Sequence, residues 1–209
     1  HLGLGRLLQK SEATNKIILS DGVFSMEGSI APLAELVALK KEHQALLLID
    51  DAHALGVLGK NGKGCAEQLQ IDPEDIDLLI GTFGKAFGSS GAFVAGKHDL
   101  LEYVMQKARS LIYTTAAPAV LIAACATSLA IIQNEPARRE RLQQNIAYYK
   151  KLIKHLQHPS LESISSIQSI VLGDNDKVIR LSQALAAEGI LVLPIRPPTV
   201  PANSARLRI

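Results

Sequence analysis

Two apolar runs in this chain end directly in residues that carry chemistry. The first run, Leu46–Ile49, is followed by Asp50-Asp51-Ala52-His53, and the second, Ile76–Ile80, interrupted only by Asp77, is followed by Gly81-Thr82-Phe83-Gly84-Lys85. Short apolar runs bounded by polar residues or glycine are typical of buried strands in a parallel sheet. Ligands of such sheets bind beyond the carboxyl ends of the strands. We therefore expect an acid, an imidazole and an amine at one edge of a sheet.

These three groups suit an aldehyde cofactor with a basic ring nitrogen. A lysine amine forms a Schiff base with the aldehyde, and a carboxylate pairs with the ring cation. Asp50 follows four apolar residues, so we expect its carboxylate to be largely buried, where it needs a cationic partner. His53 could donate to a ring oxygen. Small residues follow Lys85 and let the backbone approach a bulky ligand.

Other interpretations of the same residues remain open. Asp50 or Asp51 could cap the following helix, and a single histidine often satisfies a local backbone group. Asp50, Asp51 and His53 could bind a metal ion, although the chain has no further Cys/His cluster. A nucleotide-binding P-loop is disfavoured. Only two residues separate Gly81 from Gly84, where a P-loop has four, and Ala86 replaces the required hydroxyl.

The balance of charge excludes some classes of partner. Lys and Arg number 22 against 20 Asp and Glu, so nothing favours a nucleic acid or a membrane surface. The apolar stretch 116–132 is interrupted by polar residues and proline. It falls short of the roughly 20 residues of a bilayer span, so we expect a buried helix. The two distant cysteines, Cys65 and Cys125, favour a reducing compartment, the cytoplasm, over a disulfide.

The remaining pattern predicts an α/β fold with a mainly parallel sheet and a smaller second lobe. Strands are expected at 16–19, 45–49, 78–80, 92–95, 167–172, 190–194 and 205–209. Helices are expected at 32–43, 99–109, 117–133, 135–156 and 175–187, the last followed by Gly189 where a helix ends. A break at 158–160 separates the long helix from the second lobe. We expect the domains to span 1–135 and 136–209.

Three segments together carry a family resemblance: Asp21–Gly28, Leu48–His53 and Gly81–Lys85. They resemble the α-oxoamine synthases, which are pyridoxal-phosphate enzymes of the aspartate-aminotransferase fold, fold type I. The match runs collinearly from about Ile17 to Ile209. Ile195–Pro201 and Ala205–Ile209 are most similar to the members that serve biotin biosynthesis.

The resemblance implies a cofactor-binding set: Lys85, Asp50, His53, Ser25, Thr82, Thr114 and Thr115. Lys85 would carry the cofactor, Asp50 would pair with the ring nitrogen, and His53 with Ser25 would contact the ring hydroxyl side. Lys85, Asp50 and His53 would be catalytic. Thr82 would contact the cofactor phosphate. In a homodimer, Thr114 and Thr115 of one subunit would contact the phosphate bound by the other subunit.

The resemblance also implies the substrates. Arg208 would hold an amino-acid carboxylate and Arg196 would serve the substrate nearby, whereas Arg206 is expected to be exposed on an edge strand. The reaction would be a decarboxylative condensation of L-alanine with pimeloyl-CoA or a pimeloyl carrier protein. Relatives that condense glycine with acetyl-CoA or succinyl-CoA are the alternative, and so is a non-catalytic relative that keeps the fold.

The ends of the chain suggest an excerpt of a longer polypeptide. The sequence lacks an initiator Met and stops inside a strand-like run at Ile209. By the same resemblance, the glycine-containing phosphate cup and a ring-stacking histidine would precede His1. A final strand and helix would follow Ile209. We therefore expect this chain alone to hold the cofactor poorly.

Overall fold

The computed structural model describes residues 1–155 and 161–209, which form two compact units. The first unit contains His1–Val23 and Ala31–Arg139, and the second contains Phe24–Ile30 and Glu140–Ile209. The expected domains, 1–135 and 136–209, stay a prediction. The short segment Phe24–Ile30, however, belongs to the second unit although its neighbours in sequence belong to the first.

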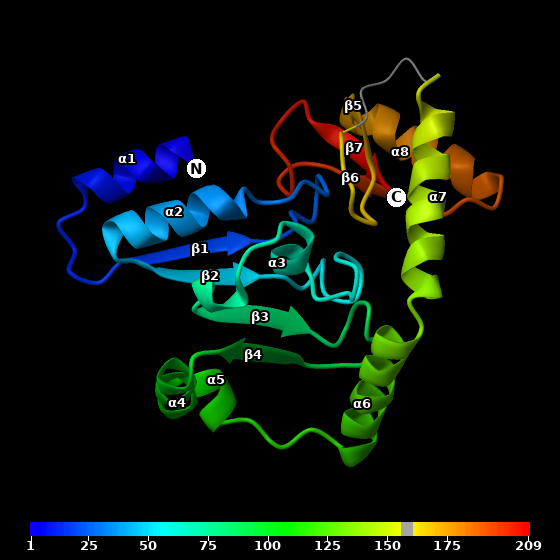
Figure 1. Ribbon diagram of the computed structural model, residues 1–209. Helices are drawn as coiled ribbons and strands as arrows, with labels where there is room; N and C mark the ends of the chain where they lie inside the picture. The colour runs from blue at the N-terminus through cyan, green and yellow to red at the C-terminus, as the bar shows by residue number, and fades with distance from the viewer. Residues whose placement is uncertain (156–160) are drawn as a thin grey trace. The chain divides into compact units, whose positions relative to one another are not determined.

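A four-stranded sheet forms the centre of the first unit (Figure 1). Its strands are β1 (Ile17–Asp21), β2 (Leu46–Asp50), β3 (Leu78–Thr82) and β4 (Ala92–Gly96), in that order across the sheet. The first three are parallel, as predicted. β4 is antiparallel to β3, because the short connection between them leaves no room for a crossover.

Helices connect and cover these strands. They are α1 (Leu2–Lys10), α2 (Leu33–His43), α3 (Cys65–Gln68), α4 (His98–Lys107), α5 (Arg109–Ile112) and α6 (Ala119–Asn134), with a 3₁₀ turn at Pro73–Asp75. α2 joins β1 to β2 and buries Leu33, Leu36 and Val37 at helical spacing. α1 lies beside α2 in Figure 1, and the sequence analysis did not predict it.

The burial of the strands alternates. Leu47 and Ile49 on β2 are fully buried and Ile18 on β1 nearly so, which places the core on one face of the sheet. On the other face, Ile17 and Leu19 are 61% and 68% exposed. The expectation of a buried strand at 16–19 therefore holds for one face of β1 only.

Asp77, directly before β3, connects elements at the edge of the sheet where β3 begins. Asp77 accepts a hydrogen bond from the backbone nitrogen of Leu47 at 2.8 Å and pairs with Lys40 at 2.7 Å and Lys97 at 3.2 Å. Burial opposes its ionisation, but these hydrogen bonds outweigh burial and lower the pKa of Asp77. The single acid in the second apolar run is therefore a structural residue.

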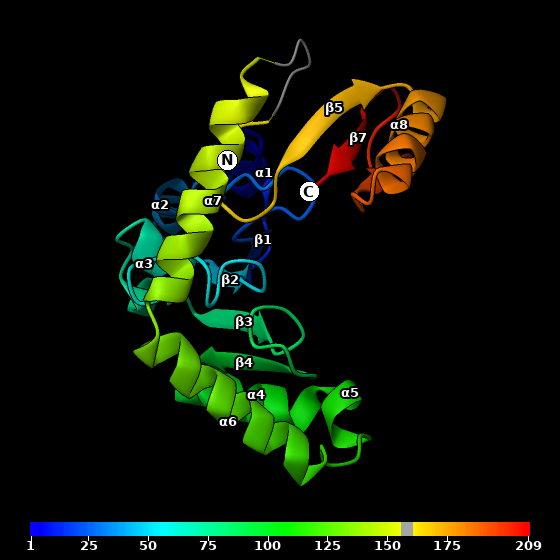
Figure 2. The same ribbon diagram turned by 90° about the vertical axis from the view of Figure 1, so that its right-hand side faces the viewer.

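The second unit contains a three-stranded antiparallel sheet in the order β5-β7-β6. The strands are β5 (Ser169–Gly173), β6 (Leu193–Ile195) and β7 (Ala205–Arg208). Helix α8 (Asn175–Ala187) packs on this sheet through a buried cluster of Val178, Val192, Ala205 and Leu207 (Figure 2). The cluster forms the core of this unit.

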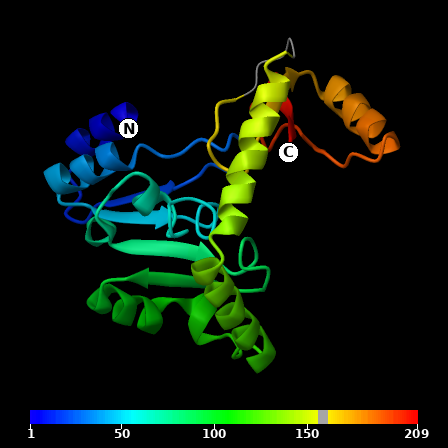
Figure 3. The same cartoon turned by 45° about the vertical axis from the view of Figure 1, so that its right-hand side comes forward.

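Helices α8 and α7 (Ala137–Ile153) correspond to two of the predicted helices. Asp174 caps α8 by accepting from the backbone nitrogen of Lys177 at 2.7 Å, and Gly189 lies just beyond it with φ +82°. Helix α7 is continuous in Figure 3. The predicted continuation to Leu156 and the break at 158–160 lie outside the described residues.

Helix α6 departs from its predicted burial. Cys125 is its single buried residue, whereas Val120 is 73% and Ile122 58% exposed. The described chain covers only one side of α6: Ser128 contacts the loop after β3, and Ile132 lies against Gly56 and Gly62 in the turn after β2. Across residues 1–155 and 161–209, no single helix is long and apolar enough to cross a membrane. Only the bent pair of α6 and α7 passes that test together.

Candidate active site

The two predicted strand ends lie on adjacent parallel strands. Asp50 is the last residue of β2 and is paired in register with Ile80 of β3, two residues before Thr82. Because β2 and β3 run in the same direction, both end at one edge of the sheet (Figure 1). Asp50 and the loop that starts at Thr82 are therefore brought to the same edge, as predicted.

The Asp50 carboxylate is half-buried and partly engaged. Its Oδ1 atom accepts a hydrogen bond from the backbone nitrogen of Ala52 at 3.0 Å, which fixes the turn that follows the strand. Among the described residues no side chain forms an ion pair with Asp50. This contact belongs to a turn and is not the helix cap that the sequence left open, because no helix begins directly after Asp50. The carboxylate still has an oxygen for a cationic ligand.

The fully buried acid is Asp51, which corrects the expectation for Asp50. Asp51 is 1% exposed, and its Oδ2 accepts from the backbone nitrogen of Cys65 at 2.9 Å. Its Oδ1 has no hydrogen-bond partner among the described residues. Burial raises the pKa of Asp51 and the nearby Asp50 charge adds to this, while hydrogen bonds from Cys65 oppose it. Burial and the Asp51 charge also raise the pKa of the Cys65 thiol.

The alternation along β2 could have identified Asp51. Leu47 and Ile49 are fully buried, and Asp51 continues their side of the strand at the next odd position. Asp50 continues the half-buried side of Leu46 and Leu48. The alternation of side chains along the strand therefore explains why Asp51 points into the core and Asp50 does not.

His53 lies in the turn that begins at Asp51. The backbone nitrogens of Ala54 and Leu55 donate to the Asp51 carbonyl at 2.9 and 3.1 Å, so the chain folds back immediately after the strand. The His53 side chain is half-buried. No group of three or more His, Cys, Asp or Glu side chains suited to a metal exists within the described ranges, so the metal alternative has no support.

The loop after β3 is closed by hydrogen bonds around Thr82. The Thr82 hydroxyl donates to the Gly91 carbonyl and accepts from the backbone nitrogen of Gly84, both at 3.1 Å. The backbone nitrogen of Gly88 donates to the Lys85 carbonyl at 2.9 Å. Lys85 itself is exposed. Because the Thr82 proton is directed at Gly91, contact of Thr82 with a phosphate stays a prediction.

Three phenylalanines anchor this loop, and no sequence motif pointed to them. Phe83 meets Phe87 edge to face at 5.4 Å between ring centroids, and meets Phe93 at 5.1 Å. The Phe87 carbonyl accepts from the hydroxyl of Ser128 on α6 at 2.7 Å. Phe83 and Phe87 stand two residues on either side of Lys85. Their fixed rings therefore hold the base of the lysine while its side chain faces solvent.

The second unit contains Ser25 and both predicted substrate arginines. Nη1 of Arg208 donates to the Ser25 carbonyl at 3.3 Å. Arg196 is exposed and its carbonyl accepts from the backbone nitrogen of Thr199 at 3.0 Å. The structure therefore brings Ser25 and Arg208 together, whereas their convergence with Asp50 and Lys85 of the first unit stays a prediction.

Arg206 contradicts its predicted exposure. β7 is the central strand of its sheet, and Arg206 is 4% exposed. Its Nη1 forms an ion pair with Oε1 of Glu27 at 2.9 Å. The prediction failed because the residues that bury Arg206 include a segment about 180 positions earlier in the chain.

Thr114 and Thr115 lie in the exposed connection between α5 and α6 of the first unit. The backbone nitrogen of Thr114 donates to the carbonyl of Leu111 at 3.2 Å. Both hydroxyls thus belong to an accessible loop, and their assignment to a partner's phosphate stays a prediction.

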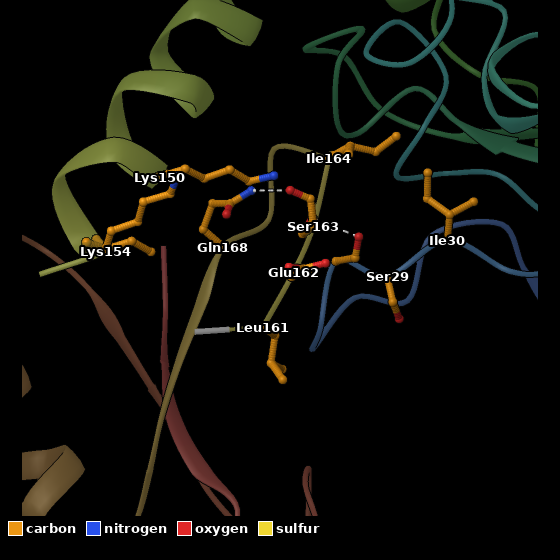
Figure 4. A pocket seen from close by; sticks show the side chains of 11 residues that line it. Ser29, Ile30, Lys150, Lys154, Leu161, Glu162, Ser163, Ile164 and Gln168 are labelled. Atoms are coloured by element: carbon orange, nitrogen blue, oxygen red, sulfur yellow. Dashed lines mark hydrogen bonds between the residues drawn. The ribbon is translucent and has the colours of Figure 1, made fainter. Parts of the chain in front are cut away.

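Two cavities occur away from the strand ends. One of about 1130 Å³ lies in the first unit, lined in part by Leu79, Phe93 and Ile132. Another of about 570 Å³ lies in the second unit, lined in part by Lys150 and Gln168 (Figure 4). Neither is lined by Asp50 or Lys85.

Comparison with known proteins identifies the family. Residues 3–209 match the family described as aminotransferase class I and II. The chain belongs to this family. The match confirms the predicted fold, a fold type I large domain with a mainly parallel sheet and a smaller α/β lobe.

Among relatives within the family, the 8-amino-7-oxononanoate synthase of Thioalkalivibrio sulfidiphilus is 45% identical over 204 residues, covering 98% of this chain and 52% of the relative. That of Marinobacter nauticus is 48% identical over 195 residues, covering 93% and 50%. The chain thus spans about half the length of these curated relatives.

Solved structures of the family are similar as well. A serine palmitoyltransferase structure described with a PLP internal aldimine has a TM-score of 0.93 and 34% identity, covering 98% of this chain and 52% of that chain. The 8-amino-7-oxononanoate synthase of Francisella tularensis has a TM-score of 0.84 and 35% identity, covering 100% and 60%. These likenesses confirm that the resemblance found in the sequence extends to the fold.

Proposed function

We propose that the protein containing this chain binds pyridoxal phosphate and condenses L-alanine with a pimeloyl thioester to give 8-amino-7-oxononanoate. The observation that carries the proposal is the position of Asp50 and the Lys85 loop at one edge of adjacent parallel strands. The choice of substrates is supported by relatives of 45% and 48% identity that carry the name of this activity.

The residues at the strand ends fit this cofactor. Asp50 has no ion pair to a side chain within the described ranges and keeps an oxygen for a ring cation. Lys85 is exposed and takes part in none of the ion pairs found there. A side chain at Gly88 would have open space, and one at Gly84 would make only ordinary contacts with Thr82 and Ser89. Asp50 would hold the ring nitrogen, Lys85 the aldehyde carbon, and Thr82 the phosphate.

Each of these side chains has a defined task. Pyridoxal phosphate, when bound, supplies a protonated ring that withdraws electrons from the substrate α-carbon. The negative charge of Asp50 keeps the proton on the ring nitrogen. The amine of Lys85 takes a proton from the α-carbon and returns one after condensation. His53 would donate to the ring oxygen, and Arg208 would hold the amino-acid carboxylate.

The proposed reaction balances without a further reactant. A bond forms between the α-carbon of alanine and the thioester carbonyl carbon, and the carbon–sulfur bond breaks to release the thiol. The original carboxylate then leaves as carbon dioxide, and a proton takes its place on the α-carbon. The residues act mainly by holding two substrates and a base at one carbon.

A product assay on the full protein tests this proposal. L-alanine with pimeloyl-CoA, or with a pimeloyl carrier protein, should yield 8-amino-7-oxononanoate detectable by mass spectrometry, and the two carriers are compared directly. Turnover only of glycine with acetyl-CoA or succinyl-CoA would contradict the substrate assignment. Absence of turnover with every pair, together with no visible absorbance band, would indicate a non-catalytic relative.

We also propose that the protein acts as a cytoplasmic homodimer. The exposed position of Thr114 and Thr115 supports a role at a subunit contact, and the two free, buried cysteines agree with a reducing compartment. Sedimentation of the full protein should give a dimer. Thr114→Ala with Thr115→Ala should weaken cofactor retention, and unchanged retention would contradict their role at a partner's phosphate.

A further inference from the structure

The segment Ser25–Gly28, itself part of the second unit, is bound at every residue by side chains from the rest of that unit. The Ser25 carbonyl accepts from Arg208, and the Met26 carbonyl accepts from the Ser169 hydroxyl at 2.8 Å. The Glu27 carboxylate pairs with Arg206. These contacts fix the position of the segment relative to β7. The segment includes Ser25, a predicted cofactor-binding residue.

The far end of the segment is fixed independently of the arginines. The Gly28 carbonyl accepts from the hydroxyls of Ser163 at 2.8 Å and Ser165 at 3.2 Å. Gln168 in turn donates to the Ser163 carbonyl at 3.3 Å, as Figure 4 shows. Gly28 has φ +71°, and a side chain there would overlap Ser163 and the Ile167 carbonyl. The serine cluster therefore anchors Gly28, and the arginines determine the position of the residues before it.

Arg206 and Arg208 reach this segment from one face of β7. They are two positions apart on a strand, so their side chains point to the same side. Arg206 also donates from Nε to the Ser204 carbonyl at 3.0 Å and from Nη1 to the Met26 carbonyl at 3.5 Å. β7 is hydrogen-bonded on both edges, to β5 and β6. Both guanidinium groups thus start from a fixed backbone.

The contact to Ser25 leaves one edge of Arg208 available. Nη1 is the atom that donates to the Ser25 carbonyl. Within the described residues, Nε and Nη2 of Arg208 have no hydrogen bond. These two atoms form the planar fork that binds a carboxylate through two parallel bonds. The position of the Ser25 carbonyl therefore determines the direction in which the free fork of Arg208 points.

We propose that the Glu27–Arg206 ion pair positions Arg208 for the amino-acid carboxylate. The Arg206 side chain is 5% exposed and Glu27 39% exposed, so the pair is shielded more than a surface pair. Glu27 is two residues from Ser25, and Arg206 is two residues from Arg208. Neither Glu27 nor Arg206 touches substrate in this proposal: both are positioning residues, and the inference rests on the proposed function.

Variants of the full, cofactor-loaded protein test the inference. In Arg206→Gln, and in Glu27→Gln, we expect the dissociation constant for L-alanine, read from the change of the visible absorbance band, to rise about tenfold. The affinity for the cofactor and the KM for the pimeloyl thioester should stay within about twofold of the unaltered protein. Glu27→Asp, which keeps the charge, should restore part of the alanine affinity. The double variant should lose no more than the worse single variant, because both remove one interaction.

Two controls separate this role from general charge or folding effects. Arg138→Gln removes an arginine from the exposed pair with Glu135, which is 2.7 Å long, and should leave alanine binding unchanged. If Arg206→Gln fails to fold, Glu27→Gln tests the same pair from its more exposed side. Unchanged alanine affinity in Glu27→Gln, or equal weakening of cofactor and both substrates, would overturn the inference. If the unaltered protein gives no absorbance band or no response to alanine, the proposed function fails instead.

Discussion

The Asp51 carboxylate accepts a hydrogen bond from the backbone nitrogen of Cys65 at 2.9 Å and is almost completely buried. Its immediate neighbour Asp50 is half-buried at the open edge of the sheet. Two consecutive acids thus have separate tasks. Asp51 joins the end of β2 to the start of α3, and Asp50 remains available to a ligand.

The burial of Asp51 predicts a pH effect on stability. Burial raises the pKa of Asp51, so in the window above its ordinary pKa of about 4 the folded protein keeps a proton that the unfolded chain has lost. The stability from this group is full at low pH and declines as the pH rises through the raised pKa. Asp51→Asn removes this titration. The Tm of the Asp51→Asn variant should therefore rise relative to the Tm of the unaltered protein as the pH increases through that window.

Thermal unfolding of both proteins at a series of pH values measures this difference. A Tm difference between the two proteins that stays constant over the whole pH range would mean that Asp51 has an ordinary pKa.

Glycines around Asp51 provide a steric prediction. A side chain at Gly22 or Gly64 would overlap the Asp51 carboxylate, and Gly64 has φ +89°. Gly22→Ala and Gly64→Ala should each destabilise the protein by about 3 kcal/mol, the upper end for overpacking. Gly3→Ala in helix α1 has open space and should stabilise by about 0.5 to 1 kcal/mol. Chemical denaturation measures all three, and a neutral Gly22→Ala would contradict the described packing.

The phenylalanine cluster predicts a link between packing and cofactor binding. Phe87 is 9% exposed and its ring contacts Phe83. Phe87→Ala should cost about 3 to 5 kcal/mol of stability and weaken cofactor binding, because the base of Lys85 loses its support. Tyr103→Ala, at a residue 64% exposed, should change stability by no more than about 0.5 kcal/mol. Cofactor retention after dialysis is the second readout, and full retention in Phe87→Ala would separate the cluster from the site.

Asp50 and Asp21 form a matched pair for testing the role of charge. They are partners in register at the ends of β2 and β1. Asp50→Asn should lower kcat by about a hundredfold or more, the scale for losing one charge-stabilising group, since an amide cannot keep the ring nitrogen protonated. Asp21→Asn makes the same change one strand away and should retain activity. Steady-state kinetics decides, and equal effects of the two substitutions would contradict the assignment of Asp50.

The strands, most helices and the position of Asp50 and of the Lys85 loop at one edge of the sheet could be predicted from the sequence. Leu46–Ile49 and Leu78–Ile80 are compact apolar runs, and the helix between β1 and β2 shows buried residues at helical spacing. Local patterns of this kind fix the element and its direction. They therefore also placed Asp50 and Lys85 at one edge, because neighbouring parallel strands end together.

Features that depend on distant segments could not be predicted. Arg206 is buried by its own sheet neighbours and by Glu27, and no local pattern reveals that β7 lies between β5 and β6. The apolar composition of α6 indicated burial, yet in the described chain most of its surface is exposed. Such properties depend on what packs against a residue and not on its own segment.

The central claim is that one ligand lies between Asp50 and Lys85. Borohydride reduction of the full protein, followed by mass spectrometry of its peptides, tests this claim most directly. Our account predicts a pyridoxyl group on Lys85, lost in Lys85→Ala and retained in Lys60→Ala. A pyridoxyl group on another lysine, or none in a protein that shows the product activity, would contradict it.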